Sequence, residues 1–129
     1  MRLLLDTHTF LWWDSQPAKL PSKVLALCED AKNEMFLSVA SIWEMQIKHQ
    51  LGKLELHLPL DKLVSEQVQK NAIQILPIQT AHVLGIAALP DVHKDPFDRL
   101  LIAQANVEKM VFLSGDGVFE HYPVQIIWS

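Results

Sequence analysis

Four acidic residues stand where apolar segments end or helical patterns begin, and they are the residues best suited to chemistry: Asp6, Glu44, Asp98 and Asp116. Carboxylates gathered at one edge of a sheet would repel each other. For two charges ~5 Å apart in an effective dielectric constant of ~20, the repulsion costs about 3 kcal/mol. Divalent cations remove that cost, and an all-oxygen donor set favours Mg²⁺ or Mn²⁺ over zinc. Mg²⁺ retains waters, one of which serves as nucleophile, so the predicted chemistry is metal-dependent phosphodiester hydrolysis.

Asp6 and Asp116 each have a structural alternative that the sequence leaves open. Asp6 would cap the turn that starts at Thr7, directly after the apolar run Leu3–Leu5. Asp116 lies between two glycines, a composition that is ordinary in turns. Taken alone, Asp116 does not point to a metal site, whereas for Asp6 a functional role is favoured over the cap.

Glu44 and Asp98 also have structural alternatives, but their positions argue for function. Glu44 would complete a capping box with Ser41, three residues earlier, yet it shares a helical stripe with apolar residues. Asp98 stands three residues after Asp95, which suffices as the cap of its helix, and it shares a stripe with Ile102. Acids are unexpected on such stripes.

Short apolar runs alternate with helical patterns along the whole chain. The predicted strands are Leu3–Leu5, Met35–Leu37, Ile73–Ile78, Val111–Leu113 and Val124–Trp128. The predicted helices are Val24–Ala31, Val39–Leu51 with Gly52 as its stop, Leu60–Val68, Ala81–Leu89, and one that starts at Pro96 with Asp95 as N-cap. Unbroken apolar runs are typical of strands buried on both faces.

This alternation predicts a single α/β domain over residues 1–129, a three-layer α/β/α sandwich around a mostly parallel sheet. In such a sheet, ligands bind outside the carboxyl ends of the strands. Asp6 and Asp116 follow strands and should face that edge. Glu44 and Asp98 lie in early turns of helices that begin near it.

The composition excludes several classes of protein. A formal net charge of −4 excludes a protein that coats nucleic acid through bulk positive charge. The single cysteine, Cys28, excludes a disulfide scaffold and is expected in the core. The N-terminal apolar run is too short for a signal peptide, and residues 71–90 are too polar for a membrane span. We therefore expect a soluble, cytoplasmic protein.

Four motifs resemble those of the PIN-domain ribonucleases, and of the VapC-type toxins of bacterial toxin–antitoxin pairs in particular. They are Leu4–Thr7, Ser38–Glu44, His93–Ala103 and Leu113–Asp116, in the family's order. The resemblance implies that Asp6, Glu44, Asp98 and Asp116 are the catalytic, metal-binding acids, supported through hydrogen bonds by Thr7 and Ser114. It also implies an RNA substrate, a homodimer, and a small cognate antitoxin that fills a groove near the active site.

Basic residues near the acids are candidates for contacts with RNA. Arg99 either contacts an RNA phosphate or pairs with an acid. Lys48 and Lys94 belong either to a local phosphate track or to a solvated helix face. A phosphate track would make binding depend on salt despite the negative net charge. For His93, a role within its loop is favoured over a role as general base.

The tryptophans divide between core and surface. Adjacent tryptophans on a short helix cannot both face one core, so either Trp12 or Trp13 is a candidate for a partner surface. Trp43 and Trp128 are predicted to lie in the core.

Two other functions compete with a nuclease. One is a catalytically inactive PIN-like interaction module, against which the presence of all four acids argues. The other is a phosphoacceptor receiver domain, also α/β with acids at the sheet edge. A receiver needs an acid pair after the first strand and a lysine near the last, whereas Asp6 stands alone and Val124–Trp128 contains no lysine.

Overall fold

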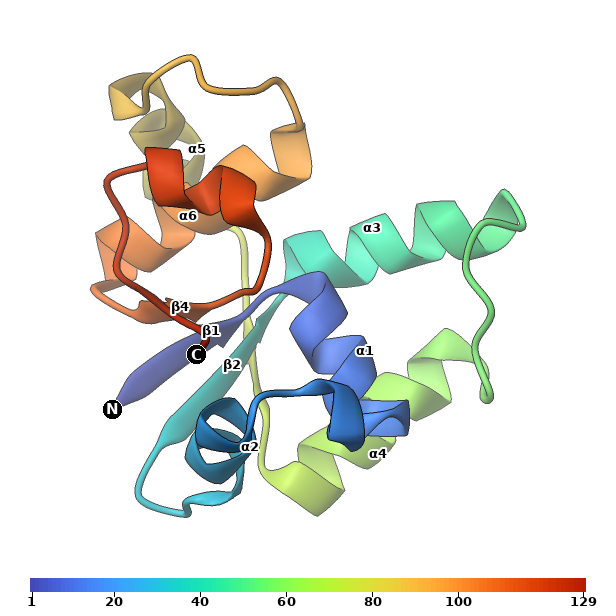
Figure 1. Cartoon of the computed structure of the whole chain (residues 1–129). Coiled ribbons are helices and arrows are strands. Elements are labelled where there is room, and N and C mark those ends of the chain that lie inside the picture. Colours follow the sequence, from blue (N-terminus) through green and yellow to red (C-terminus); the bar gives the residue numbers. More distant parts are fainter.

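The computed structural model describes all residues, 1–129, and is built on a five-stranded sheet in which every neighbouring pair is parallel. The strands are β1 (Arg2–Leu5), β2 (Glu34–Ser38), β3 (Gln74–Leu76), β4 (Val111–Leu113) and β5 (Ile126–Ile127). Their order in the sheet is β3-β2-β1-β4-β5, so β1 is central (Figure 1). The predicted parallel sheet is confirmed.

The helices connect these strands. They are α1 (Thr7–Ser15), α2 (Ser22–Glu29), α3 (Val39–Gln50), α4 (Leu60–Asn71), α5 (Thr80–Gly85) and α6 (Pro96–Glu108), with the 3₁₀ turns η1 (Pro17–Lys19), η2 (Ile86–Ala88) and η3 (Gly117–His121). Asp95 caps α6 by accepting from the N–H groups of Phe97 and Asp98, as predicted. Gly52, with φ 72°, follows the end of α3. The left-handed conformation at Gly52 is one that glycine adopts without steric cost.

Some predicted elements are longer in the sequence pattern than in the structure. The run Ile73–Ile78 yields only β3, because Pro77 has no N–H to donate to a sheet. The run Val124–Trp128 yields the two residues of β5. The predicted helix Ala81–Leu89 divides into α5 and η2.

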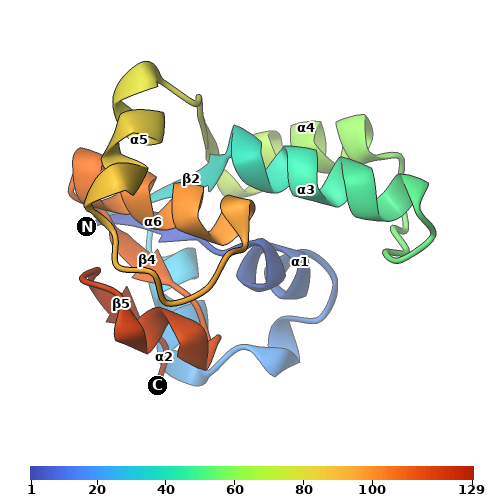
Figure 2. The same ribbon diagram turned by 90° about the horizontal axis from the view of Figure 1, so that it is seen from above.

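Helices cover both faces of the sheet, which confirms the three-layer architecture. Successive residues of a strand point to opposite faces. Leu4 therefore belongs to a core under α6, whereas Leu3 and Leu5 belong to a second core with Phe10 of α1 and Val24 of α2. Figure 1 shows α5 and α6 on one side of the sheet and α1, α2 and α4 on the other. In both ribbon views α3 projects away from the sheet edge (Figure 2).

Trp43 corrects one prediction about the core. Its side chain is 56% exposed and packs only edge-on against Phe97, with ring centroids 5.0 Å apart. The buried face of α3 is formed by Ala40, Ser41, Glu44 and Met45, and residue 43 points away from it. Trp128 is partly buried against the core, as is Trp12, while Trp13 is buried. Cys28 is buried, as expected.

No helix is both long and apolar enough to cross a lipid bilayer.

Candidate active site

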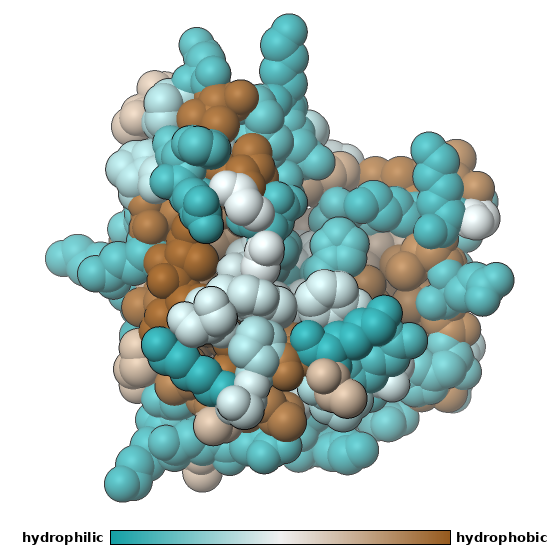
Figure 3. Space-filling view, viewed as in Figure 1, coloured by the Kyte–Doolittle hydropathy of each residue, from teal (hydrophilic) through white to brown (hydrophobic).

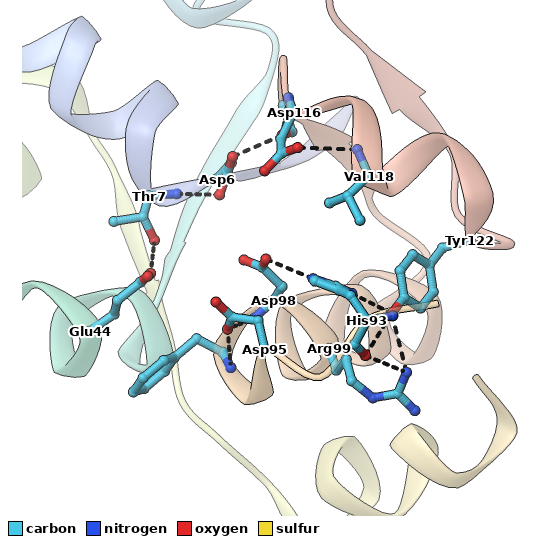
Figure 4. A network of polar contacts seen from close by, with 12 residues as sticks. Asp6, Thr7, Glu44, His93, Asp95, Asp98, Arg99, Asp116, Val118 and Tyr122 are labelled. Atoms are coloured by element: carbon cyan, nitrogen blue, oxygen red, sulfur yellow. Dashed lines mark hydrogen bonds and ion pairs between the residues drawn. The ribbon is translucent and has the colours of Figure 1, made fainter. Parts of the chain in front are cut away.

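Asp6 lies at the carboxyl end of the central strand and links it to α1. Its backbone N–H donates to the Leu113 carbonyl of β4 at 3.1 Å, which continues the β1–β4 pairing. One carboxylate oxygen accepts from the Thr7 N–H at 2.8 Å and so caps α1. The other accepts from the Ser114 hydroxyl at 2.8 Å. The side chain is only 6% exposed and is oriented by both bonds (Figure 4).

Glu44 reaches the same edge from the buried face of α3. Its Oε1 accepts from the Thr7 hydroxyl at 2.8 Å, and its Oε2 pairs with Lys48 Nζ at 2.8 Å. The N-cap of α3 is Ser38, so the capping box between Ser41 and Glu44 does not form. The structural alternative for Glu44 is therefore wrong.

Asp98 lies in the first turn of α6, where Asp95 serves as the cap. One Asp98 oxygen lies 2.9 Å from His93 Nε2, and His93 Nδ1 lies 2.6 Å from the Tyr122 hydroxyl. Arg99 Nη1 donates to that same hydroxyl at 3.2 Å. The sequence pattern did not predict this chain of contacts behind Asp98, which runs through His93 to Tyr122.

Asp116 sits beside Asp6 but is oriented differently. It is exposed, and its Oδ1 accepts from the Val118 N–H at 3.1 Å, which caps η3. Its own N–H donates to Ser114 Oγ at 3.2 Å. Asp116 thus makes the turn contact expected of a Gly-Asp-Gly segment, and Ser114 connects it to Asp6.

Three of the acids influence one another electrostatically. Burial, together with the nearby Asp98 carboxylate, raises the pKa of Asp6 to about 6, although the bond from Ser114 opposes the rise. Burial also raises the pKa of Asp98, with further contributions from the charges of Asp95 and Glu44. Figure 4 shows three side chains pointing towards a common space: Asp6 from the junction of β1 and α1, Glu44 from α3, and Asp98 from α6. The sequence prediction that distant acids gather at one edge holds for these three.

The acids are not arranged as a preformed metal cage. No group of three or more His, Cys, Asp or Glu side chains has the geometry to hold an ion. Glu44 has a cationic partner in Lys48, but neither Asp6 nor Asp98 forms an ion pair with lysine or arginine. Asp6 and Asp98, whose pKa values are raised by burial and by neighbouring carboxylates, offer only oxygen donors and fit Mg²⁺ or Mn²⁺ by their chemistry.

The basic residues near the acids make intramolecular contacts. Arg99 Nη1 donates to the Pro90 carbonyl at 2.8 Å as well as to Tyr122, and its Nη2 lies 4.0 Å from Asp91. The hydrogen bond to Glu44 raises the pKa of Lys48. Lys94 is exposed and lines a hollow of about 590 Å³ beside Arg99.

Comparisons with known proteins place this geometry in a family. In solved structures, the chain resembles VapBC2 from Rickettsia felis bound to a DNA fragment from its promoter, with 14% identity, a TM-score of 0.74 and full coverage of both chains. It also resembles FitAcB from Neisseria gonorrhoeae, with 17% identity, a TM-score of 0.65, and coverage of 97% of this chain and 96% of that one. No curated protein matches in sequence. The PIN domain model matches residues 3–125, and the chain therefore belongs to the PIN domain family.

Proposed function

We propose that the chain is a Mg²⁺-dependent endoribonuclease that hydrolyses RNA phosphodiester bonds and acts as a VapC-type toxin in the cytoplasm. The observation that carries this proposal is the convergence of Asp6, Glu44 and Asp98, whose charges act on one another at the carboxyl edge of the sheet. Membership of the PIN domain family, a family of nucleases, supports the hydrolytic chemistry.

Mg²⁺ or Mn²⁺ would be held by Asp6, Glu44 and Asp98, with Asp116 joining through the oxygen that does not cap η3. When bound, the ion supplies the positive charge that offsets the acids and the developing charge of the phosphodiester. Ser114 and the Thr7 N–H hold Asp6 in place, and the Thr7 hydroxyl holds Glu44. These bonds orient the carboxylates before substrate arrives, as supporting contacts commonly do at metal sites.

Lys48 has a role that follows from its pairing with Glu44. Without a metal, its ammonium group neutralises that carboxylate. If Glu44 held a divalent cation, the Lys48 ammonium group would no longer be needed to neutralise this carboxylate and could contact an RNA phosphate. Lys94 and Arg99 line a hollow beside His93, which contacts Asp98, and they are further candidates for contacts with RNA.

The decisive experiment is expression in bacteria with and without the neighbouring gene, with the RNA ends mapped in each culture. We expect growth arrest and new RNA termini when the chain is expressed alone, and relief of both when the neighbouring gene is present. Normal growth with intact RNA would instead favour a catalytically inactive interaction module.

His93 should tune the metal site through Asp98. Replacing His93 with Phe keeps an aromatic ring beside Phe119 but removes the contact with the Asp98 oxygen. We expect the affinity for Mn²⁺, measured by calorimetric titration, to fall by about tenfold, because supporting partners of metal ligands have effects of this size. The control is His121→Phe, on an exposed histidine of η3. Equal affinity in both variants would contradict this role.

The proposed antitoxin should bind in an apolar groove between α3 and α4. The groove encloses about 680 Å³ and is lined by hydrophobic residues that include Ile42, Trp43, Val64 and Val68. On the face seen in Figure 1, hydrophobic residues also reach the surface between polar ones (Figure 3). Because α3 also carries Glu44, a helix lying in this groove would sit next to the acids.

A charge placed in the groove tests this assignment. Val68, 38% exposed on α4, is replaced with Glu. We expect the affinity for the antitoxin, measured by surface plasmon resonance, to fall by more than about tenfold, since a charge at an apolar contact is desolvated without a partner. Leu84→Glu on α5, also at an exposed apolar residue, should bind normally. Equal loss in the two variants would place the antitoxin elsewhere.

A further inference from the structure

A small hollow opens directly beside Asp6 and Asp116. It encloses about 250 Å³ and is lined by Asp6, His8, Thr9, Trp12, Gly115 and Asp116. Pockets for drug-sized ligands usually measure about 300–1,000 Å³, so this hollow suits something smaller, of the size of one heterocycle. Since Asp6 and Asp116 line it, any occupant lies next to the predicted site of phosphodiester cleavage.

The aromatic wall of the hollow is held in place by contacts from distant parts of the chain. Trp13, its neighbour on α1, is buried, which leaves Trp12 at the surface, only partly covered. The Trp12 ring lies 6.0 Å from the Trp128 ring, between centroids, and 6.2 Å from the His8 ring. Trp128 in turn lies against Gly115, where an added Cβ would come within 2.4 Å of the indole. A side chain at residue 115 would therefore displace this wall.

The charges around the hollow are divided in a way that suits a nucleotide. Its acidic side is formed by Asp6 and Asp116, which repel a bare phosphate but not a neutral base. Outside the lining of the hollow, the exposed Lys19 places its ammonium nitrogen 5.7 Å from the centre of the Trp12 ring. A base on Trp12 would thus have a cation available for its neighbouring phosphate.

We propose that this hollow is a nucleobase subsite, in which one base of single-stranded RNA beside the cleaved bond stacks on Trp12. The inference rests on the proposed ribonuclease function and adds a contact that binds a base of the substrate. Aromatic side chains are the usual platform for unpaired bases, and they bind every base because each one has a π face. The subsite would place the adjoining phosphate next to the acids, where the proposed divalent cation would offset their repulsion.

The test compares strands that carry bases with strands that lack them. Asp98→Asn serves as the background, so that RNA is bound without being cut. Fluorescence anisotropy measures its affinity for oligoadenylate and oligouridylate strands of about 12 nucleotides, and for an abasic strand of equal length and charge. The added variants are Trp12→Leu, which removes the aromatic face, and Trp12→Phe, which retains one. Leu84→Ala, at an exposed position on α5, is the control.

We expect Trp12→Leu to weaken binding of the base-bearing strands by about tenfold, the size of one stacking contact, and to leave abasic binding unchanged. Trp12→Phe should recover most of the loss, and Leu84→Ala should show none. Equal weakening for both kinds of strand, or no weakening, would overturn the subsite while leaving the ribonuclease proposal intact. Failure of every form to bind RNA, together with intact RNA in cells, would overturn both.

Discussion

Asp98→Asn is expected to abolish RNA cleavage and to leave the folded chain at least as stable as the wild type. Asparagine has the same shape, so the contact with His93 and the cap at Asp95 persist. The variant loses the negative charge that a divalent cation requires, and cleavage should fall by more than about 100-fold, beyond the loss caused by removing a supporting partner. Stability should not fall, because burial and neighbouring acids raise the pKa of Asp98 and so disfavour its charged form.

The matched control for this variant is Asp95→Asn, three residues earlier in the same helix turn. It removes the same charge, and asparagine caps helices about as well as aspartate. Asp95 uses its carboxylate for the N–H groups of Phe97 and Asp98, so its loss of charge should change cleavage only slightly. Cleavage of an end-labelled RNA and thermal unfolding measure both properties. Normal cleavage by Asp98→Asn would remove this residue from the active site.

Local sequence is enough to predict where Asp6 and Asp98 lie in the fold. Asp6 was placed at the carboxyl edge because it follows a run that is buried on both faces, and β1 is indeed the central strand. Asp98 was separated from Asp95 because one residue suffices as a cap, and Asp95 alone makes those bonds. Both inferences depend only on residues that are neighbours along the chain, and the structure confirms both because strand ends and helix caps are local features.

The contacts that sequence reasoning missed depend on packing between distant segments. His93 reaches Asp98 across a loop, and its other nitrogen meets Tyr122, which lies 29 residues further along the chain. The signal available in the sequence was the position of His93 within the acidic motif. Its residue type predicts Trp43 in the core, whereas its position on α3 turns it outward. Side-chain type predicts burial only when the helix face agrees.

Lys48 illustrates a pairing that the sequence did contain. Glu44 and Lys48 stand four residues apart on a helix, with the acid first, which is the favourable order for an ion pair. The alternatives considered from the sequence were a phosphate track and a solvated face. The structure shows that the partner of Lys48 is the acidic site itself, which makes its availability to RNA depend on what neutralises Glu44.

Asp6→Asn is expected to stabilise the metal-free chain, and the gain should depend on pH in a way that identifies its cause. The pKa of Asp6 is raised to about 6 in the folded chain, whereas an unperturbed aspartate has a pKa near 4. Below about pH 4, Asp6 is protonated in both states and the variant gains nothing. Above about pH 6 it is charged in both, and the wild type is destabilised by up to about 3 kcal/mol relative to the variant.

Urea unfolding in EDTA between pH 4 and pH 8 measures the free energy of unfolding of both proteins. The contributions of all other titrating groups are the same in both and cancel in the difference, which is the gap between variant and wild type. Asparagine can still accept from the Thr7 N–H, and the Ser114 hydroxyl can rotate to accept from its amide. Asp30→Asn, at an exposed acid after α2, is the control and should show no such gap. A gap that does not change with pH would mean that the charge of Asp6 is not the cause.

Adding Mn²⁺ at pH 7.5 should reverse the order of the two proteins. A cation that binds only the folded wild type at 1,000 times its dissociation constant contributes about 4.1 kcal/mol, which exceeds the gap, while Asp6→Asn has lost a ligand and should gain little. Cleavage of RNA should stop in EDTA and return with Mg²⁺ or Mn²⁺. Equal stabilisation of both proteins, or activity that survives thorough chelation, would contradict a metal site at Asp6. The Asp6 carboxylate, which lowers the stability of the metal-free protein, would then have no function that accounts for its burial.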